Sequence, residues 1–151
     1  MNRRLLAAGV LVLGCRTGGP RPLRPAAEEV VSARASLVHP AAIRAVTDQG
    51  IPLRFTDPAA GVVETDYVDI STFRQDAIQY PAAERLIRLR IVVTPHEESP
   101  ASRLTVYAIY APFRNSLGDV RRGERAVPPD HPAMDLVRRI VEQVRKTTEG
   151  G

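Results

Sequence analysis

Tryptophan is absent from this sequence of 151 residues, and cysteine and lysine occur once each, as Cys15 and Lys146. A single cysteine excludes a disulfide bond within the chain. It also leaves no thiol for a nucleophile or a cysteine-based metal site in a domain that begins after it. The other basic residues are all arginines, a bias that is typical of a GC-rich genome and does not by itself indicate a binding function.

Long apolar runs are also lacking, which excludes a membrane protein with several spans. Hydrophobic residues make up 44% of the chain and charged residues 25%, a composition typical of globular proteins rather than of disordered ones. The length is sufficient for one domain of ordinary size and not for two. Thirteen prolines against ten glycines indicate stiff connections around a modest core.

The first fourteen residues have the pattern of a signal peptide. Arg3 and Arg4 precede an apolar run of ten residues, Leu5 to Gly14. A helix of that length spans about 15 Å, half the hydrocarbon thickness of a bilayer. We therefore interpret residues 1–14 as a cleaved signal and not as a membrane span.

The run ends in Val12-Leu13-Gly14-Cys15, which resembles the lipobox of bacterial lipoproteins. The resemblance implies cleavage before Cys15 and lipidation of its thiol, with acyl chains such as palmitate as the membrane anchor. Each buried methylene contributes about 0.8 kcal/mol, so two or three chains hold a protein on a membrane permanently. Because Arg16 follows the cysteine instead of aspartate, we expect the outer membrane, with the domain facing the periplasm. The alternative is an incidental cysteine in an ordinary secretory signal or an uncleaved anchor.

Cleavage at this point would remove two arginines and lower the formal charge from +4 to +2 (4 minus 2). A net charge so close to zero does not favour nucleic acid as a partner.

Residues 15–29 are rich in proline and glycine, and we interpret them as the lipidated cysteine and a flexible tether. Residues 30–151 then form a single domain. Its first segment, 30–37, fits strand or helix, and its alternation favours a strand. The patterns that follow predict a helix with Pro40 in its first turn and Gly50 at its end, and strands over 53–56, 63–67, 85–94 and 103–111. Residues 71–84 are polar and irregular, and we expect a short helical turn there. A final helix follows, with Asp130 as its cap and Pro132 in its first turn.

This order predicts an α+β fold, an antiparallel four- to five-stranded sheet with two helices packed on one face. The final helix has an apolar stripe for the core, formed by Met134, Val137, Ile140, Val141 and Val144. The opposite face of the sheet would be open to solvent, with mixed charge from Arg54, Glu64, Asp66, Arg88, Arg90, Thr105 and Tyr107.

Residues 40–70 carry a family resemblance. The series Ala42, Ala45, Val46, Gly50, Ile51, then Phe55 and Asp57, then Gly61, Val62, Val63 and Thr65, is similar to a signature of the helix-grip lipoprotein of the β-barrel assembly machinery. That outer-membrane lipoprotein has two helix-grip domains, whereas this chain has room for one. The resemblance implies a helix-grip fold and a partner in envelope assembly.

Candidate catalytic groups are few. His39 and His131 each precede a proline, where capping or turn chemistry explains them, and His96 lies beside two glutamates that are expected to be solvated. Glu64 and Asp66 share one face of a strand, but cross-strand pairing with arginine is favoured over acid–base chemistry. No His-Glu-x-x-His, Gly-x-Ser-x-Gly or phosphate-loop motif is present. The arginines of residues 121–125 fit a solvated loop better than a contact with lipid headgroups.

We therefore expect a non-catalytic domain that is anchored to the membrane through Cys15 and acts through an envelope protein partner. The sequence predicts no enzyme activity, cofactor or metal site. The alternative is a carrier of a small ligand or lipid, with a pocket between helix and sheet lined by Leu53, Phe55, Ile87 and Leu89.

Overall fold

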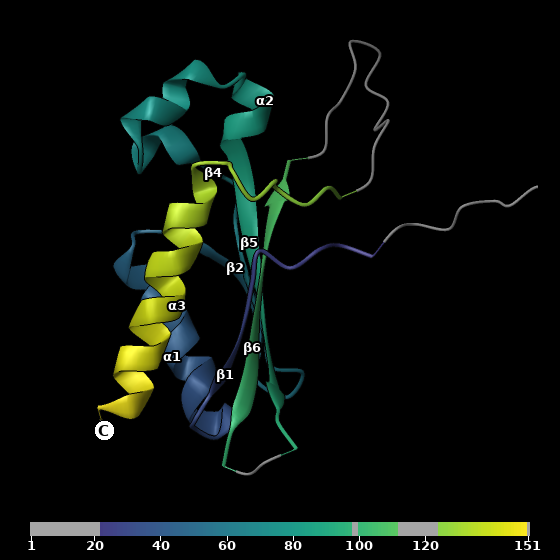
Figure 1. The fold of residues 1–151 in the computed structure, drawn as a ribbon, viewed down its shortest axis with the longest axis vertical. Helices are drawn as coiled ribbons and strands as arrows, with labels where there is room; N and C mark the ends of the chain where they lie inside the picture. The colour runs from purple at the N-terminus through teal and green to yellow at the C-terminus, as the bar shows by residue number, and fades with distance from the viewer. Residues whose placement is uncertain (1–21, 98–99, 112–123, 151) are drawn as a thin grey trace, which may run out of the picture.

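The computed structural model describes residues 22–97, 100–111 and 124–150, so residues 1–14, which the sequence predicts to be a signal peptide, and Cys15 lie outside the described residues. The elements follow the order of Figure 1. They are β1 (Ala27–Val31), α1 (Ala35–Asp48), β2 (Leu53–Asp57), β3 (Val62–Thr65), β4 (Val68–Asp69), the 3₁₀ turns η1 (Ile70–Thr72) and η2 (Gln75–Gln79), α2 (Ala82–Arg85), β5 (Leu86–Pro95), β6 (Ser102–Tyr110) and α3 (Ala133–Glu149).

The strands form one antiparallel sheet in the order β1-β6-β5-β3-β2, and the two-residue β4 pairs with β5 beyond the end of β3. Helices α1 and α3 lie side by side on the same face of this sheet (Figure 1). The predicted α+β class and the two helices on one face are confirmed. The sheet has six strands instead of four or five, because β4 is too short for alternation to predict it.

The core lies between the helices and the central strands. Ile87, Leu89 and Ile91 of β5 are fully buried there, as are Val106 and Ile140. All five residues of the predicted stripe on α3 are buried, so that prediction is confirmed. Burying a side chain of this size stabilises a fold by about 1.5–3 kcal/mol.

The start of the domain differs from the prediction. The first strand lies at Ala27–Val31, so the predicted boundary between tether and domain at 29/30 falls inside β1. Backbone pairing of Ala27 with Val106 and of Val31 with Ser102 fixes this strand, although its own sequence is weakly apolar. Non-local pairing with β6 therefore outweighs the local pattern.

Helix α1 begins at Ala35 and not near Pro40, which places this proline inside the helix. Proline has no N–H to donate to the carbonyl oxygen of Ser36, four residues earlier. Because Ser36 is in the first turn, only one hydrogen bond near the helix start is lost. The predicted end is confirmed: the helix stops at Asp48 and Gly50 has a φ of 72°.

The turn between β2 and β3 matches its predicted chemistry. The carboxylate of Asp57 accepts the backbone N–H groups of Ala59 and Ala60 at 2.9 and 3.0 Å. Gly61 has a φ of 67° and sits against β5 so closely that a Cβ would lie 2.1 Å from the carbonyl oxygen of Val93. The turn therefore holds the hairpin against the sheet in one register.

Residues 70–85, called the apical segment below, comprise η1, η2 and α2 and lie at the N-terminal end of α3 (Figure 1). The sequence predicts a polar segment with a short helical turn over 71–84, and short helical turns are present there. The expected cap of α3 by Asp130 is wrong, because the N–H of Ala133 is bound instead by Nδ1 of His131 at 3.1 Å. None of the helices within the described ranges is long and apolar enough to cross a bilayer.

Candidate functional site: the helix-free face of the sheet

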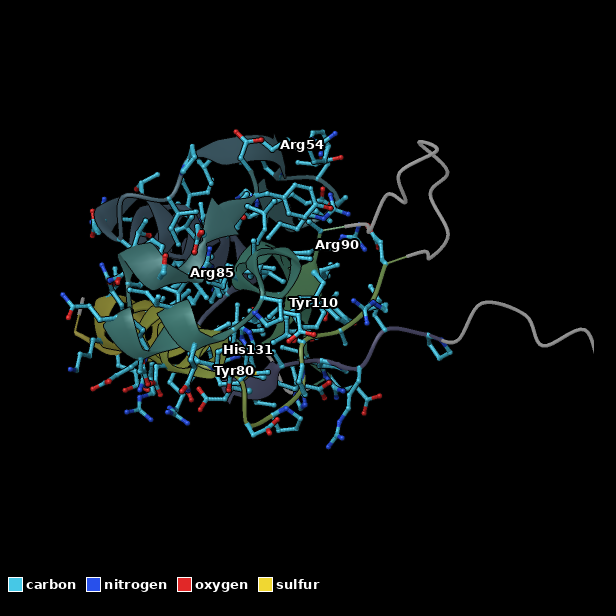
Figure 2. All side chains as sticks on the ribbon, turned by 90° about the horizontal axis from the view of Figure 1, so that it is seen from above. Arg54, Tyr80, Arg85, Arg90, Tyr110 and His131 are labelled. Carbon is cyan, nitrogen blue, oxygen red and sulfur yellow. The ribbon has the colours of Figure 1, made fainter. Side chains whose placement is uncertain are left out.

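Within the described residues, no helix covers the face of the sheet opposite α1 and α3 (Figure 1). Strand alternation places Arg88 and Arg90 of β5 on this face, between the buried Ile87, Leu89 and Ile91. Figure 2 shows Arg90 on the side of the sheet away from the helices. We call this surface the helix-free face.

One row of side chains runs across four strands of this face. In the backbone register, Phe55 of β2 is opposite Glu64 of β3, Glu64 is opposite Arg90 of β5, and Arg90 is opposite Tyr107 of β6. Side chains opposite one another in adjacent strands are in contact range. The row therefore places one aromatic ring on each side of an arginine–glutamate pair.

Two arginines and two glutamates form an ion-pair cluster at the centre of the face. Glu64 accepts hydrogen bonds from Arg88 at 3.2 Å and from Nε of Arg90 at 2.5 Å. Glu124, from the segment that follows β6, binds Arg90 at 3.1 and 3.3 Å and also pairs with Arg88. This arginine–glutamate cluster has no net charge.

Arg88 is the most buried member of the cluster, with 8% of its surface exposed. Its guanidinium lies over the ring of Tyr67, 5.6 Å from the ring centroid, in a cation–π contact. Its Nε is buried and has no hydrogen-bond partner among the described residues. The guanidinium is thus fixed by the two glutamates and the ring, and the cluster is already ordered.

Glu124 reaches the face through the backbone segment 124–127, which lies along β6. The N–H of Tyr110 donates to the carbonyl of Arg125 at 3.0 Å, and the N–H of Val127 donates to the carbonyl of Ala108 at 2.9 Å. The side chain of Arg125 stacks over the ring of Tyr110 at 5.1 Å. These bonds hold Glu124 beside the two arginines.

Phe55 reaches the helix-free face because of an irregularity in β2. Leu53 pairs with Thr65 and Phe55 pairs with Glu64, so the register shifts by one residue at Arg54. A β-bulge of this kind turns every later side chain of the strand to the opposite face. Phe55, predicted to point inward with Leu53, is 51% exposed.

These four residues, Leu53, Phe55, Ile87 and Leu89, therefore do not line a common pocket, and that prediction is wrong. Ile87 and Leu89 are fully buried against the helices, and Phe55 lies on the other face. A groove of about 600 Å³ lies elsewhere, between α1, the β2–β3 turn and the end of β5. Its walls include Pro40, Ile43, Pro58 and Val93, with His39 as a polar group.

Glu64, Arg88, Arg90 and Tyr107 share one face, and Glu64 pairs with arginine across the strands, so both predictions are confirmed. Arg54 is exposed at the bulge, outside the cluster, and Asp66 follows the end of β3, where its N–H donates to Pro52. Cys15, Arg121 and Arg122 lie outside the described residues. Three features of the helix-free face are not predicted by the sequence pattern: the contribution of Glu124, the contact of Tyr67 with Arg88 and the exposure of Phe55.

The three histidines lie outside the arginine–glutamate cluster. His39 lies inside α1, with Nε2 3.3 Å from the carbonyl oxygen of Val62, so the predicted position at a helix start is wrong. His131 is a cap, as expected. His96 lies in the β5–β6 loop, and its N–H donates to Ala101 at 3.0 Å. Among residues 22–97, 100–111 and 124–150, no three histidine, cysteine, aspartate or glutamate side chains are grouped as metal ligands.

No protein-family model and no curated protein matches the sequence.

Proposed function

We propose that the chain is a lipid-anchored domain of the bacterial envelope that acts without catalysis, by binding a protein partner on the helix-free face of its sheet. The observation that carries this proposal is the row Phe55–Glu64–Arg90–Tyr107 with the ordered cluster around it. Aromatic residues and arginine are enriched at the cores of protein interfaces, and tyrosine and arginine are among the residues whose truncation costs the most binding energy. Here both types are presented together on a rigid strand surface.

The electrostatics of the face support a protein partner. The two arginines already have glutamate partners, so a partner surface that covers them does not leave an unpaired charge behind. Because the cluster is ordered before binding, little side-chain entropy is lost when it is covered. Because its charges balance, the cluster offers no excess positive charge to a polyanion such as nucleic acid.

The lipobox supports a location at the membrane. Ten residues separate Cys15 from Ala26, whose N–H donates to Val106 at 2.7 Å and so begins the folded domain. A fully extended segment of that length reaches at most about 40 Å. A domain anchored in this way remains close to the membrane, where envelope-assembly proteins are located.

The anchor is tested by mass spectrometry of the protein purified from bacterial membranes. We expect a chain that begins at Cys15 and carries acyl chains, and we expect a Cys15→Ser variant to remain unprocessed and unacylated. An intact Met1, or an unmodified Cys15 in the mature protein, would contradict the anchor.

The interaction is tested by co-purification from detergent-solubilised envelopes. The double variant Phe55→Ser/Tyr107→Ser should lose the partner, which is then identified by mass spectrometry. The matched control is Leu37→Ser, which removes a side chain of similar exposure, 59% against 51% for Phe55, from the helix layer. Equal recovery of the partner by both variants would contradict the proposal.

A second candidate function, the carrier of a small apolar molecule, is favoured by the groove of about 600 Å³ beside α1. This volume falls in the range of ligand sites. Ala60 lines the groove, and Ala60→Trp would fill it. Dodecanol is a suitable probe: NMR shift changes of Ile43 and Val93 that disappear in the variant would support a carrier, and no shift in the wild type would contradict it.

A further inference from the structure

A second polar cluster lies at the end of the molecule, where the apical segment meets the start of α3. Its centre is His131, of which only 2% is exposed. The ring contacts Tyr80 of the apical segment and Tyr110 of β6 edge to face, with centroids 5.0 and 5.5 Å away. Figure 2 shows the three rings next to one another.

Both ring nitrogens of His131 are engaged, and their partners define the protonation state. Nδ1 accepts the N–H of Ala133, which is a donor, so Nδ1 carries no proton. Nε2 lies 2.9 Å from the carbonyl oxygen of Glu84, which is an acceptor, so Nε2 carries the proton. The closed arrangement thus requires the neutral ring.

A second proton on Nδ1 would face the N–H of Ala133 and end that hydrogen bond. It would also place a cation at the N-terminal end of α3, where the helix dipole is unfavourable to positive charge. The charged ring would fit only after turning out of the site, which breaks its bond to Glu84 and its contact with Tyr80.

The groups around the ring shift the pKa of His131 in opposite directions. Burial has the largest effect and lowers the pKa of His131, whereas the backbone carbonyl and the charge of Glu84 and the charge of Asp130 raise it, and the net effect is a lowered pKa. Arg125 stacks on the far ring, Tyr110. Asp135 in the first turn of α3 is already paired with Arg74 of the apical segment and with Arg138.

We propose that His131 is a pH-sensitive latch: its neutral ring holds residues 80–84 of the apical segment against the start of α3, and protonation of the ring releases them. The latch joins two segments that are 47 residues apart in the chain, through one side chain. It is independent of the proposed function, since it involves neither Cys15 nor the arginine–glutamate cluster.

The expected size of the effect follows from linkage. The released ring has the ordinary histidine pKa of 6.5, whereas the pKa of the ring in the closed site is lowered, chiefly by burial. The ratio of released to closed molecules therefore rises as the pH falls, by up to about 30-fold between pH 7.5 and pH 5. Above pH 7 the latch stays closed.

The experiment is an NMR hydrogen-exchange titration of the full domain. The protection factor of the Ala133 N–H is the readout, because it removes the intrinsic pH dependence of exchange. We expect this factor to fall by up to about 30-fold from pH 7.5 to pH 5, and the ¹⁵N shifts of His131 to show the Nε2–H tautomer at pH 7.5. A constant protection factor, or a charged ring in the closed state, would overturn the proposal.

Two variants separate the latch from a general loss of stability. His131→Asn provides an oxygen for the Ala133 N–H, and His131→Gln provides an N–H for the Glu84 carbonyl, and neither titrates in this range. Both variants should lose the pH-dependent step, that is, the fall in the protection factor between pH 7.5 and pH 5. His39→Gln changes a buried histidine in α1 and should keep it. A step that persists in both His131 variants would overturn the proposal. If neither variant folds, the wild-type titration decides.

Discussion

Gly61 is the single residue on which the β2–β3 hairpin depends most. Its φ of 67° and a Cβ position 2.1 Å from the Val93 carbonyl oxygen leave no space for a side chain. We predict that Gly61→Ala lowers the free energy of unfolding by about 3 kcal/mol or more, because the backbone of β5 must move.

The matched control is Gly50→Ala. Gly50 has a similar φ of 72°, but beyond its two chain neighbours no atom of the described residues lies within 4 Å of its Cβ position, so only the conformational cost of about 1 kcal/mol remains. Urea unfolding followed by circular dichroism measures both. Equal losses in the two variants would show that the contact with β5 is unimportant.

Asp69 contributes to the pH dependence of the folded state's stability in acid. Hydrogen bonding from Ser71, first through its side chain and then its backbone N–H, and the charge of Arg85 lower the pKa of Asp69 below its ordinary value of 3.8. The native state therefore binds fewer protons than the unfolded state. The resulting stability is present above about pH 4 and is lost as the pH falls through the native pKa.

Asp69→Asn keeps an oxygen for the Ser71 N–H but does not titrate. We predict a smaller loss of stability below pH 4 in this variant than in the wild type, measured by thermal unfolding at pH 3 and pH 5. The same acid slope in both proteins would contradict the assignment to Asp69.

At the scale of elements, α3 carries the most regular sequence pattern and gives the clearest test of the core. Ile140 is fully buried. Ile140→Asp would place an unpaired carboxylate there, and we predict a loss of several kcal/mol, about enough to unfold a domain of ordinary stability.

Arg139→Asp is the control, because it introduces the same carboxylate at an exposed neighbouring position of the same helix. This variant should stay within about 1 kcal/mol of the wild type. Comparable melting temperatures for the Ile140 variant and the wild type would contradict the placement of α3 on the sheet.

Elements with strong local signals could be predicted from the sequence, and those fixed by distant contacts could not. The stripe of α3, the strands β5 and β6 and the Asp57–Gly61 turn have patterns that local chemistry explains. The start of β1 depends on its pairing with β6, which is far away in the chain. Helix α1 starts early, at Ala35, and so contains Pro40 in its second turn. The low helix propensity of proline predicts a start closer to Pro40.

At the scale of the whole molecule, the arginine–glutamate cluster joins β3, β5 and the segment 124–127. Glu64 bonds to both arginines, and Arg88 is buried beneath it. We predict that Glu64→Gln lowers the free energy of unfolding by about 2–3 kcal/mol, since it leaves a buried guanidinium with half its counter-charge.

The control is Glu28→Gln, which removes the partner of Arg103 in an exposed pair at 2.9 Å. Exposed pairs contribute about 0–1 kcal/mol, so this variant should be nearly neutral. Both are measured by urea unfolding at low and at high salt. Similar small effects for the two would show that the cluster adds nothing to stability.

About half of the helix-free face could be derived from the sequence. Alternation along β3, β5 and β6 is enough to place Glu64, Arg88, Arg90 and Tyr107 together. Glu124 joins them from a segment without a periodic pattern, and Phe55 joins them through a bulge, which shifts the face of a residue without changing the sequence pattern. Both are consequences of the tertiary structure.

The most direct test of the central proposal is site-specific photocrosslinking in living cells. A photoreactive phenylalanine analogue is placed at Phe55 or Tyr107 on the helix-free face, and at Leu37 on the helix layer as the control. The proposal predicts a crosslink to one envelope protein from positions 55 and 107 and none from position 37. Crosslinks from position 37 alone, or from none of the three, would contradict it.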